Sequence, residues 1–349
     1  MSNKSLDTSI SRRRVLQVAA ATAFLSTMPA WAKSRGRIVV GTSGGDYERL
    51  INEYIEKPIF NPAGWSSVHD IGTDLDRRSK VVAGSRLPRG TTDVQALPAL
   101  FWYQMSQAGV LAKIDYDRLP NAVNLLPSMR YPFGVATGFT AAVPLYNPKL
   151  VEKPQSYKDV LNAKHGNKLG LIDIQHHYVM SAASLAAGGK LNDLEPGKKL
   201  LMELRKAGVR IYPSNEAFAQ ALKSEEISIG IMWKARAVQW KNAGINVESS
   251  TPAEGALKFV LGWCVPKNAP NKDGAWDFLN ASLDPAVQNG FATTLGYPPT
   301  VTNANILEEL NKRIGFSTQE LEALLDLDYA YLTENEMPLR DWWDKVFKA

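Results

Sequence analysis

Short apolar segments alternate with helix-forming segments along most of the chain, and this alternation limits the folds that the sequence can adopt. The first apolar segment, residues 37–40, precedes a predicted helix that begins at Asp46 and places Leu50, Ile51 and Ile55 on one face. Further segments typical of strands span residues 93–97, 139–145, 169–174, 227–233 and 258–265, and helices are predicted near residues 103–109 and 275–283. Because strands alternate with helices, the sequence predicts an α/β protein.

The start of the chain has the features of a cleavable export signal. The sequence SRRRVL at residues 11–16 leads into an apolar stretch that ends near residue 29 and is too short to span a bilayer comfortably. Small residues follow in Ala30-Trp31-Ala32, which predicts cleavage after Ala32. The arginines fit the twin-arginine pattern, which predicts export of an already folded protein to the periplasm. An ordinary signal peptide and a retained anchor are the alternatives.

The rest of the chain carries little net charge. Residues 1–32 hold Lys4, Arg12, Arg13 and Arg14 against Asp7, so the signal carries +3 of the formal +5 and the remaining chain about +2. Composition therefore does not favour a nucleic-acid partner.

The 317 residues after Ala32 are long for one hydrophobic core and suit two domains. Cys264 is the single cysteine, so the chain cannot form an internal disulfide. It lies in an apolar run, which favours a buried, inert thiol over a nucleophile.

The glycine turn at residues 41–45, GTSGG, allows several interpretations. It matches the G-x-S-x-G pattern of serine hydrolases, with Asp173 and His176 in the correct chain order, but it follows the first predicted strand and lacks an upstream oxyanion loop. A phosphate loop is disfavoured because no Gly-Lys-Ser/Thr follows. The turn could instead donate backbone N–H groups to a polar ligand, or it could be a tight connection that needs glycine.

Tryptophans stand at or near the ends of predicted strands. Trp233 ends the segment 227–233, and Trp102 and Trp263 occupy comparable positions. Each alone is most simply a core residue, whereas several together suggest a flat-walled ligand cleft.

The order and spacing of several segments resemble the periplasmic solute-binding proteins of ABC importers, specifically the type II class that includes spermidine/putrescine-binding proteins. The segments that carry the resemblance are residues 39–47, GVLAKIDYDRL at 109–119, YNPK at 146–149, SYKDV at 156–160, IGIMW at 229–233, residues 265–275 and LGYPPT at 295–300.

The resemblance implies the type II periplasmic binding protein fold, with a ligand cleft between two α/β lobes joined by two crossing segments. The crossings are expected near residues 140–145 and 251–258. Lobe 1 is expected to comprise residues 33–141 and 257–310, lobe 2 residues 142–256, and residues 311–349 a C-terminal helical segment that the sequence assigns to neither lobe. The implied protein is not an enzyme, needs no cofactor, and delivers a small molecule to a membrane permease.

The resemblance also implies binding positions. Tyr47, Trp233 and Tyr297 match aromatic residues of the polyamine cleft. The remaining implied positions are Ser43, Gly44 and Gly45 in a first binding loop, Trp102 in a second near residues 97–102, and Gln175, His176, His177, Tyr178 and Lys258 around the ligand.

The charges of this predicted site depart from those of polyamine binders. Positions where polyamine binders carry carboxylates match Gln175, Tyr178 and Leu261, and Lys234 and Arg236 lie nearby. A dication without a carboxylate partner would be poorly solvated in a closed cleft. The sequence therefore predicts an anionic or zwitterionic ligand, with a polyamine as the alternative if a shifted alignment brings Asp46, Asp173 or Glu254 into the cleft.

The run His176-His177-Tyr178 also suggests a metal site. Adjacent side chains on one element diverge, however, and no Asp or Glu completes a ligand set at metal spacing. No metal is predicted.

Overall fold

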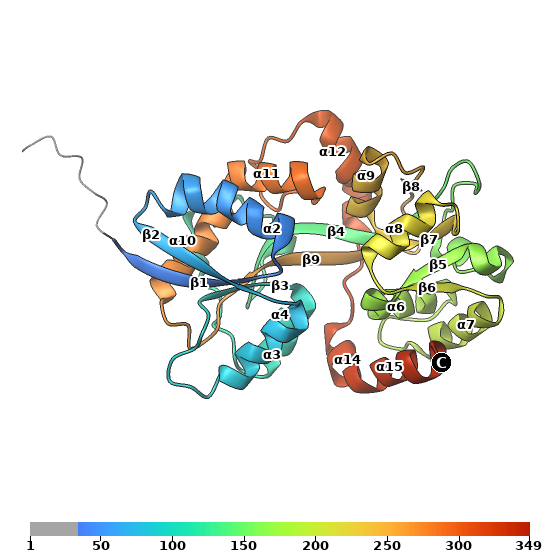
Figure 1. Ribbon diagram of the computed structural model, residues 1–349, viewed down its shortest axis with the longest axis horizontal. Coiled ribbons are helices and arrows are strands. Elements are labelled where there is room, and N and C mark those ends of the chain that lie inside the picture. The colour runs from blue at the N-terminus through green and yellow to red at the C-terminus, as the bar shows by residue number, and fades with distance from the viewer. Residues whose placement is uncertain (1–33) are drawn as a thin grey trace, which may run out of the picture.

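The computed structural model describes residues 34–349, which form a nine-stranded sheet with helices on both faces (Figure 1). The strand order is β2-β1-β3-β9-β4-β7-β5-β6, with β8 beside β4. The strands are β1 (Gly36–Thr42), β2 (Trp65–Ile71), β3 (Val94–Pro98), β4 (Val135–Tyr146), β5 (Leu169–Ile172), β6 (Arg210–Tyr212), β7 (Ile229–Trp233), β8 (Glu248–Ser249) and β9 (Leu257–Cys264). The predicted export signal, residues 1–32, lies outside the described residues.

Helices connect most of these strands, as the alternation in the sequence predicts. They are α2 (Gly45–Leu50), continued by the π-helix η2 (Ile51–Phe60), α3 (Asp74–Gly84), α4 (Ala99–Gln107), α5 (Tyr157–Val160), α6 (His176–Ala186), α7 (Glu195–Lys206), α8 (Asn215–Lys223), α9 (Lys234–Asn242), α10 (Lys272–Ser282), α11 (Pro285–Leu295), α12 (Glu308–Ile314), α13 (Thr318–Glu322), α14 (Tyr329–Glu334) and α15 (Glu336–Trp342), continued by η8 (Trp343–Phe347). Short 3-10 helices span Tyr116–Arg118, Pro120–Asn124, Pro127–Met129, Ala163–Lys168 and Asp173–Gln175. Between residues 34 and 349, no helix has the length and apolar character that a membrane crossing requires.

Local sequence explains several helix boundaries. The side chain of Thr73 accepts a hydrogen bond from the Asp76 N–H group at the start of α3, and Asp284 caps α11 in the same way. Gly296 ends α11 with φ of 72°, in the left-handed region that favours glycine. On the helix predicted from Asp46, Leu50, Ile51 and Ile55 are fully buried, as the apolar spacing predicts.

Two hydrophobic cores divide the molecule into two lobes, which confirms the predicted two-lobed α/β architecture. The lobe 1 core takes its residues from 38–139 and 260–301. The lobe 2 core takes its residues from 141–257 and 327–347. The change from one core to the other therefore falls between Phe139 and Ala141 on β4 and between Leu257 and Val260 on β9.

Strands β4 and β9 pass from one lobe into the other as an antiparallel pair (Figure 1). Their register runs from Val135 opposite Trp263 to Ala142 opposite Leu257, with an irregularity between Ala136 and Gly138. Every residue of β4 is buried, since the strand lies in the middle of the sheet and is covered on both faces.

The C-terminal segment makes a further connection beside β9. The Lys258 N–H group donates to the Leu325 carbonyl oxygen at 2.8 Å, and the Leu325 N–H group donates to the Ala256 carbonyl oxygen at 2.9 Å. The chain then forms α14 and α15 beneath lobe 2 (Figure 1), where Trp343 and Phe347 are fully buried in the lobe 2 core. The structure thus packs the end of the chain onto lobe 2.

Candidate functional site

Four aromatic side chains meet where the two lobes join, and we call this group the aromatic junction: Tyr178, Trp233, Phe259 and Tyr297. The ring of Trp233 lies 4.6 Å from Tyr178 and 4.5 Å from Phe259, measured between ring centroids. Tyr297 lies 6.4 Å from Phe259. The structure therefore brings together Tyr178, Trp233 and Tyr297, three of the predicted binding residues, and adds Phe259, which sequence reasoning missed.

The elements that carry these rings explain why they meet. Trp233 is the last residue of β7, Tyr178 lies in the first turn of α6, and Tyr297 follows the left-handed end of α11. Phe259 lies on the crossing strand β9. Ends of α/β strands and the loops that follow them are where such sheets place ligands.

Tyr47 lies on the lobe 1 side with an unpaired hydroxyl group. Its ring packs 6.0 Å from Trp263 and edge-on to Phe291 at 5.4 Å. The Tyr47 hydroxyl and the Thr137 hydroxyl are both buried, and neither has a hydrogen-bond partner among residues 34–349. Burial raises the pKa of Tyr47 and the Thr137 hydroxyl opposes the rise, so the phenol is protonated and the two hydroxyl groups lie near each other, although not in hydrogen-bond geometry.

Arg236 contributes a third unpaired polar group, from lobe 2. Its Nη1 donates to Gln239 Oε1 at 2.9 Å, whereas its buried Nε has no partner in the described chain. Arg236 lies in the first turn of α9, and Trp233, the residue before that helix, gives it no side-chain cap. The Gln239 amide donates to the Leu295 carbonyl oxygen at 2.7 Å, which ties α9 to the loop before Tyr297.

Asp74 and Arg77 on α3 are functional candidates that sequence reasoning missed. Arg77 is fully buried and donates to the Gly72 and Ala96 carbonyl oxygens, at 3.0 and 2.7 Å. It also pairs with Asp74 Oδ1 at 2.5 Å. Burial raises the pKa of Asp74 although Arg77 opposes the rise. The only sequence signal was Thr73 before two acidic residues, a pattern that marks a helix start rather than a binding site.

The charges of Asp74 and Arg236 both affect the pKa of Tyr297. Burial raises the pKa of Tyr297, Arg236 lowers it and Asp74 raises it further. The loop that carries Tyr297 also contacts α9 directly, since a methyl group added at Gly296 would lie 3.3 Å from the Ala235 carbonyl oxygen. A carboxylate from lobe 1 and a guanidinium from lobe 2 are therefore both near enough to influence Tyr297.

The predicted binding residue Lys258 and the nearby Lys234 both have partners within the protein. Lys258 Nζ pairs with Asp326 Oδ2 at 2.9 Å, so its charge is neutralised within the protein. Lys234 donates to the Gly315 carbonyl oxygen and lies 4.3 Å above the Phe316 ring. Burial lowers the pKa of Lys234.

Gln175, His176 and His177 lie on the lobe 2 side. Burial lowers the pKa of His176 to about 4 and that of His177 to about 3, so both imidazoles are neutral near pH 7. His176 packs 5.9 Å from Trp343 of the C-terminal helix, and His177 packs 4.8 Å from Tyr178. The Gln175 amide donates to Asn215 Oδ1 at 3.4 Å. Of these residues, His177 is the one in contact with the aromatic junction.

The glycine turn is a tight connection that requires glycine at two positions. Gly44 and Gly45 have φ of 77° and 61°, which explains the requirement for glycine there, and Ser43 is exposed. Gly45 lines an outer hollow with Glu48 and His69 rather than the aromatic junction.

The serine-hydrolase triad is not assembled. The Asp173 carboxylate accepts from the Trp343 indole at 2.7 Å and pairs with Lys348 at 2.9 Å, while Ser43 belongs to lobe 1. The other carboxylates that a shifted alignment would have placed in the cleft are also engaged elsewhere. Asp46 pairs with Arg49, and Glu254 accepts from the backbone N–H group of Tyr157.

Trp102 is a core residue, not a wall of the site. It is 2% exposed and packs 5.5 Å from Tyr131. A methyl group added at Gly134 would lie 2.3 Å from the Trp102 ring, so this glycine makes room for the indole. The core interpretation of this tryptophan therefore holds.

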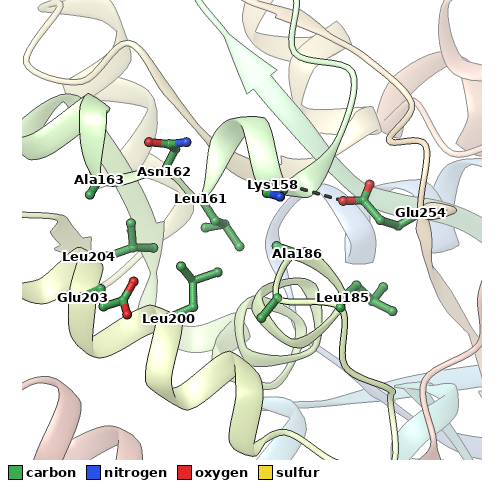
Figure 2. Close-up of a pocket in the computed structure, with 12 residues that line it drawn as sticks. Lys158, Leu161, Asn162, Ala163, Leu185, Ala186, Leu200, Glu203, Leu204 and Glu254 are labelled. Atoms are coloured by element: carbon green, nitrogen blue, oxygen red, sulfur yellow. Dashed lines mark hydrogen bonds between the residues drawn. The ribbon is translucent and has the colours of Figure 1, made fainter.

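Two surface hollows lie away from the aromatic junction. Figure 2 shows the first, of about 620 Å³ on lobe 2, where Leu161, Leu200 and Leu204 surround an opening between α5 and α7. Glu254 lines this hollow, but no predicted binding residue does. The second, of about 580 Å³, lies on lobe 1 beside the edge strand β2. Across residues 34–349, no group of three His, Cys, Asp or Glu side chains is arranged to hold a metal ion.

Comparison of the sequence with known proteins finds one matching family and several curated relatives. Residues 79–317 match the family described as bacterial extracellular solute-binding protein. The chain is 27% identical over 227 residues to the spermidine/putrescine-binding periplasmic protein of Salmonella typhimurium, a match that covers 60% of this chain and 63% of that protein. The match to the corresponding protein of Escherichia coli has the same identity and extent.

Solved structures share the fold. An ABC transporter substrate-binding protein from Bradyrhizobium japonicum superposes with a TM-score of 0.77 at 22% identity, covering 90% of this chain and 100% of that one. An ABC transporter structure from Clostridium perfringens gives the same TM-score and identity, over 89% of this chain and 99% of that one.

Proposed function

This chain belongs to the family of bacterial extracellular solute-binding proteins, and from that premise we propose that it is a periplasmic receptor that captures a small polar solute and delivers it to an ABC import permease. The observation that carries the proposal is the set of buried, unpaired polar groups beside the aromatic junction: the Tyr47 hydroxyl, the Thr137 hydroxyl and Arg236 Nε. Buried polar groups in native proteins almost always have partners, so these groups suit a ligand that would supply them.

The proposed ligand is anionic or zwitterionic. The unpaired donors near the junction include Arg236 Nε and the Tyr47 and Thr137 hydroxyl groups, which favour an anionic group on the ligand. Polyamine binding is the alternative, because the curated relatives bear that name and because two carboxylates, Asp74 and Asp326, influence the junction residues Tyr297 and Tyr178.

The proposed working units are the two lobes. Residues 33–141 with 257–310 would move against residues 142–256, with closure over the ligand presented to the permease. The division between the two cores on β4 and β9 supports hinges at these strands. The packing of Trp343 in the lobe 2 core supports movement of the C-terminal helices with lobe 2.

We propose that the protein is not an enzyme. The exposed Ser43 and the engagement of Asp173 with Trp343 and Lys348 argue against a serine hydrolase. An activity-based serine probe tests this: labelling that disappears in Ser43→Ala would contradict the receptor function.

Native mass spectrometry tests the receptor function directly. Protein purified from the periplasm without refolding should carry a small molecule that dissociates on unfolding. The same compound, added back at 100 times its dissociation constant, should stabilise the protein by about 2.7 kcal/mol. A chain that carries no small molecule and is stabilised by none in a broad metabolite screen would not be a solute receptor.

A further inference from the structure

We propose that the ligand is a zwitterion whose anionic group binds Arg236 of lobe 2 and whose ammonium group binds Asp74 of lobe 1, an inference that rests on the proposed receptor function. The compound class is an amino acid, or an amino phosphonate, with its charges at opposite ends. Each charged group of the ligand would then bind a different lobe.

The anionic end is assigned from three unpaired donors. Arg236 Nε, the Tyr47 hydroxyl and the Thr137 hydroxyl are buried without partners in the described part of the chain. Thr137 is 6% exposed, so its hydroxyl has little access to bulk water. Arg236 also sits in the first turn of α9, a nine-residue helix whose N-terminal end attracts negative charge.

The positive end is assigned from Asp74. Its Oδ1 pairs with Arg77, while Oδ2 is in no hydrogen bond among residues 34–349. Arg77 keeps its contacts with the Gly72 and Ala96 carbonyl oxygens whether or not Asp74 also binds a ligand. Asp74 is also partly exposed, with 41% of its side chain accessible. A ligand ammonium group can therefore share this carboxylate.

The space between the two charges is bounded by aromatic rings. Tyr297 follows Gly296, which lies against Ala235, the neighbour of Arg236 on α9, and Asp74 lies in the first turn of α3, the helix after the lobe 1 strand β2. Both charges also influence the pKa of Tyr297. Phe259 and Trp233 continue the aromatic surface toward lobe 2. A short hydrocarbon linker between the ligand charges would pack against these rings.

The same arrangement disfavours the other charge classes. A diamine would bring an ammonium group to Arg236, and a dicarboxylate would bring a second anion to Asp74. Like charges held together in a poorly solvated site are unfavourable, so the two side chains select against both classes.

A matched set of four-carbon compounds tests the inference: 4-aminobutanoate, butanoate, 1,4-diaminobutane and butanedioate, with ω-amino acids of two to six carbons to cover linker length. Binding is measured by calorimetry and thermal shift. At least one ω-amino acid should bind, and at least about tenfold more tightly than the diamine, monoacid and diacid of its own length.

Variants separate the two ends of the ligand. Arg236→Gln should weaken binding of that amino acid by about tenfold or more, and Tyr47→Phe by a smaller factor. Asp74→Asn should weaken it similarly and reduce the preference for the amino acid over the monoacid. Arg49→Gln removes an exposed arginine of α2 and should leave affinity unchanged. If Asp74→Asn fails to fold, the ammonium end is tested on the unchanged protein, which should bind the amino acid at least about tenfold more tightly than the monoacid of the same length, and Thr137→Val gives an isosteric test of the anionic end.

Different experimental results would contradict the inference and the proposed function. A retained ligand that is a diamine or a diacid, or a zwitterion whose affinity is unchanged in Arg236→Gln and Tyr47→Phe, would overturn the inference and leave the receptor function standing. A protein that carries and binds no small molecule would overturn both.

Discussion

At the scale of single residues, His69 on the edge strand β2 lies between two carboxylates. Its Nδ1 lies 2.8 Å from Glu48 Oε1 and its Nε2 lies 2.7 Å from Glu56 Oε1. Ser67 and Asn52 also donate to Glu56. The hydrogen bond to Glu56 is the main reason why the pKa of His69 rises from 6.5 to about 9.

The stability of the protein should therefore fall as pH rises from about 6.5 to about 9. Folded protein keeps a proton on His69 that the unfolded chain releases above its ordinary pKa, so the stabilisation is complete below 6.5 and is lost through 9. The contribution of His69 protonation to the free energy of unfolding is on the order of 3 kcal/mol. Urea denaturation at several pH values measures it, and His69→Gln should flatten the curve in this range.

His165 provides the matched control on lobe 2. Burial lowers its pKa, so its titration affects stability only at lower pH. His165→Gln should keep the decline between pH 6.5 and 9. A decline that persists unchanged in His69→Gln would assign it to another group.

The aromatic residues of the site could be predicted from the sequence, whereas its charges could not. Trp233 and Tyr297 lie where strand-end positions and family resemblance place them. The contacts of Lys258 and Lys234 could not be predicted because their partners, Asp326 and Gly315, come from a distant part of the chain. Such pairings depend on tertiary contacts that no local pattern records.

At the scale of elements, Tyr157 at the start of α5 connects both crossing strands. Its hydroxyl donates to the Ala142 carbonyl oxygen of β4 at 2.6 Å and accepts from the Leu257 N–H group of β9 at 3.0 Å. The side chain is fully buried. One phenol therefore satisfies a backbone group on each strand where the lobes join.

Tyr157→Phe should lower the free energy of unfolding by about 1–3 kcal/mol, because it leaves the buried Leu257 N–H group and the Ala142 carbonyl oxygen without this partner. Chemical denaturation measures the loss. Tyr103→Phe, at a half-buried tyrosine of α4, should cost much less. Equal costs in the two variants would show that the hydroxyl of Tyr157 adds nothing to the hinge.

The sequence predicted the crossing strands more readily than the segment beside them. An apolar run such as residues 139–145 is recognisable as a buried strand. The backbone bonds of Leu325 with β9 involve an irregular segment, whose position depends on tertiary packing rather than periodicity.

At the scale of the whole molecule, Glu336 of α15 links the C-terminal helices to lobe 1. Its carboxylate lies 3.1 Å from Arg78 Nη1 and accepts from Gln104 Nε2 at 3.2 Å. Nearby, Tyr329 of α14 packs 6.1 Å from Tyr103 of α4. Because α15 also packs on the lobe 2 core through Leu339, this contact spans the two lobes.

Glu336→Gln should shift the ligand-free protein toward a more open arrangement, since it removes an ion pair that joins the lobes. Small-angle X-ray scattering should report a larger radius of gyration, and the effect on unfolding should stay below about 1 kcal/mol because the pair is partly exposed. Glu334→Gln, at an exposed position on α14, serves as the control. An unchanged radius in Glu336→Gln would mean that the pair does not influence lobe closure.

Export of the whole protein should depend on the paired arginines. Arg12→Lys with Arg13→Lys should block delivery of folded protein to the periplasm, as cell fractionation would show, because the twin-arginine route reads these residues. Normal periplasmic yield would instead assign export to the general secretory route.

The division of each core between distant segments also sets the order in which the chain can mature during synthesis. Lobe 1 needs residues 260–301 to complete a core begun at residue 38, and lobe 2 needs Trp343 and Phe347, which are made later. Lobe 1 therefore has all of its core residues before lobe 2 does. A partly made chain that lacks residues 327–347 leaves the apolar surface of lobe 2 that these residues cover exposed to water, so lobe 2 is expected to be the last to reach a state fit for passage in folded form.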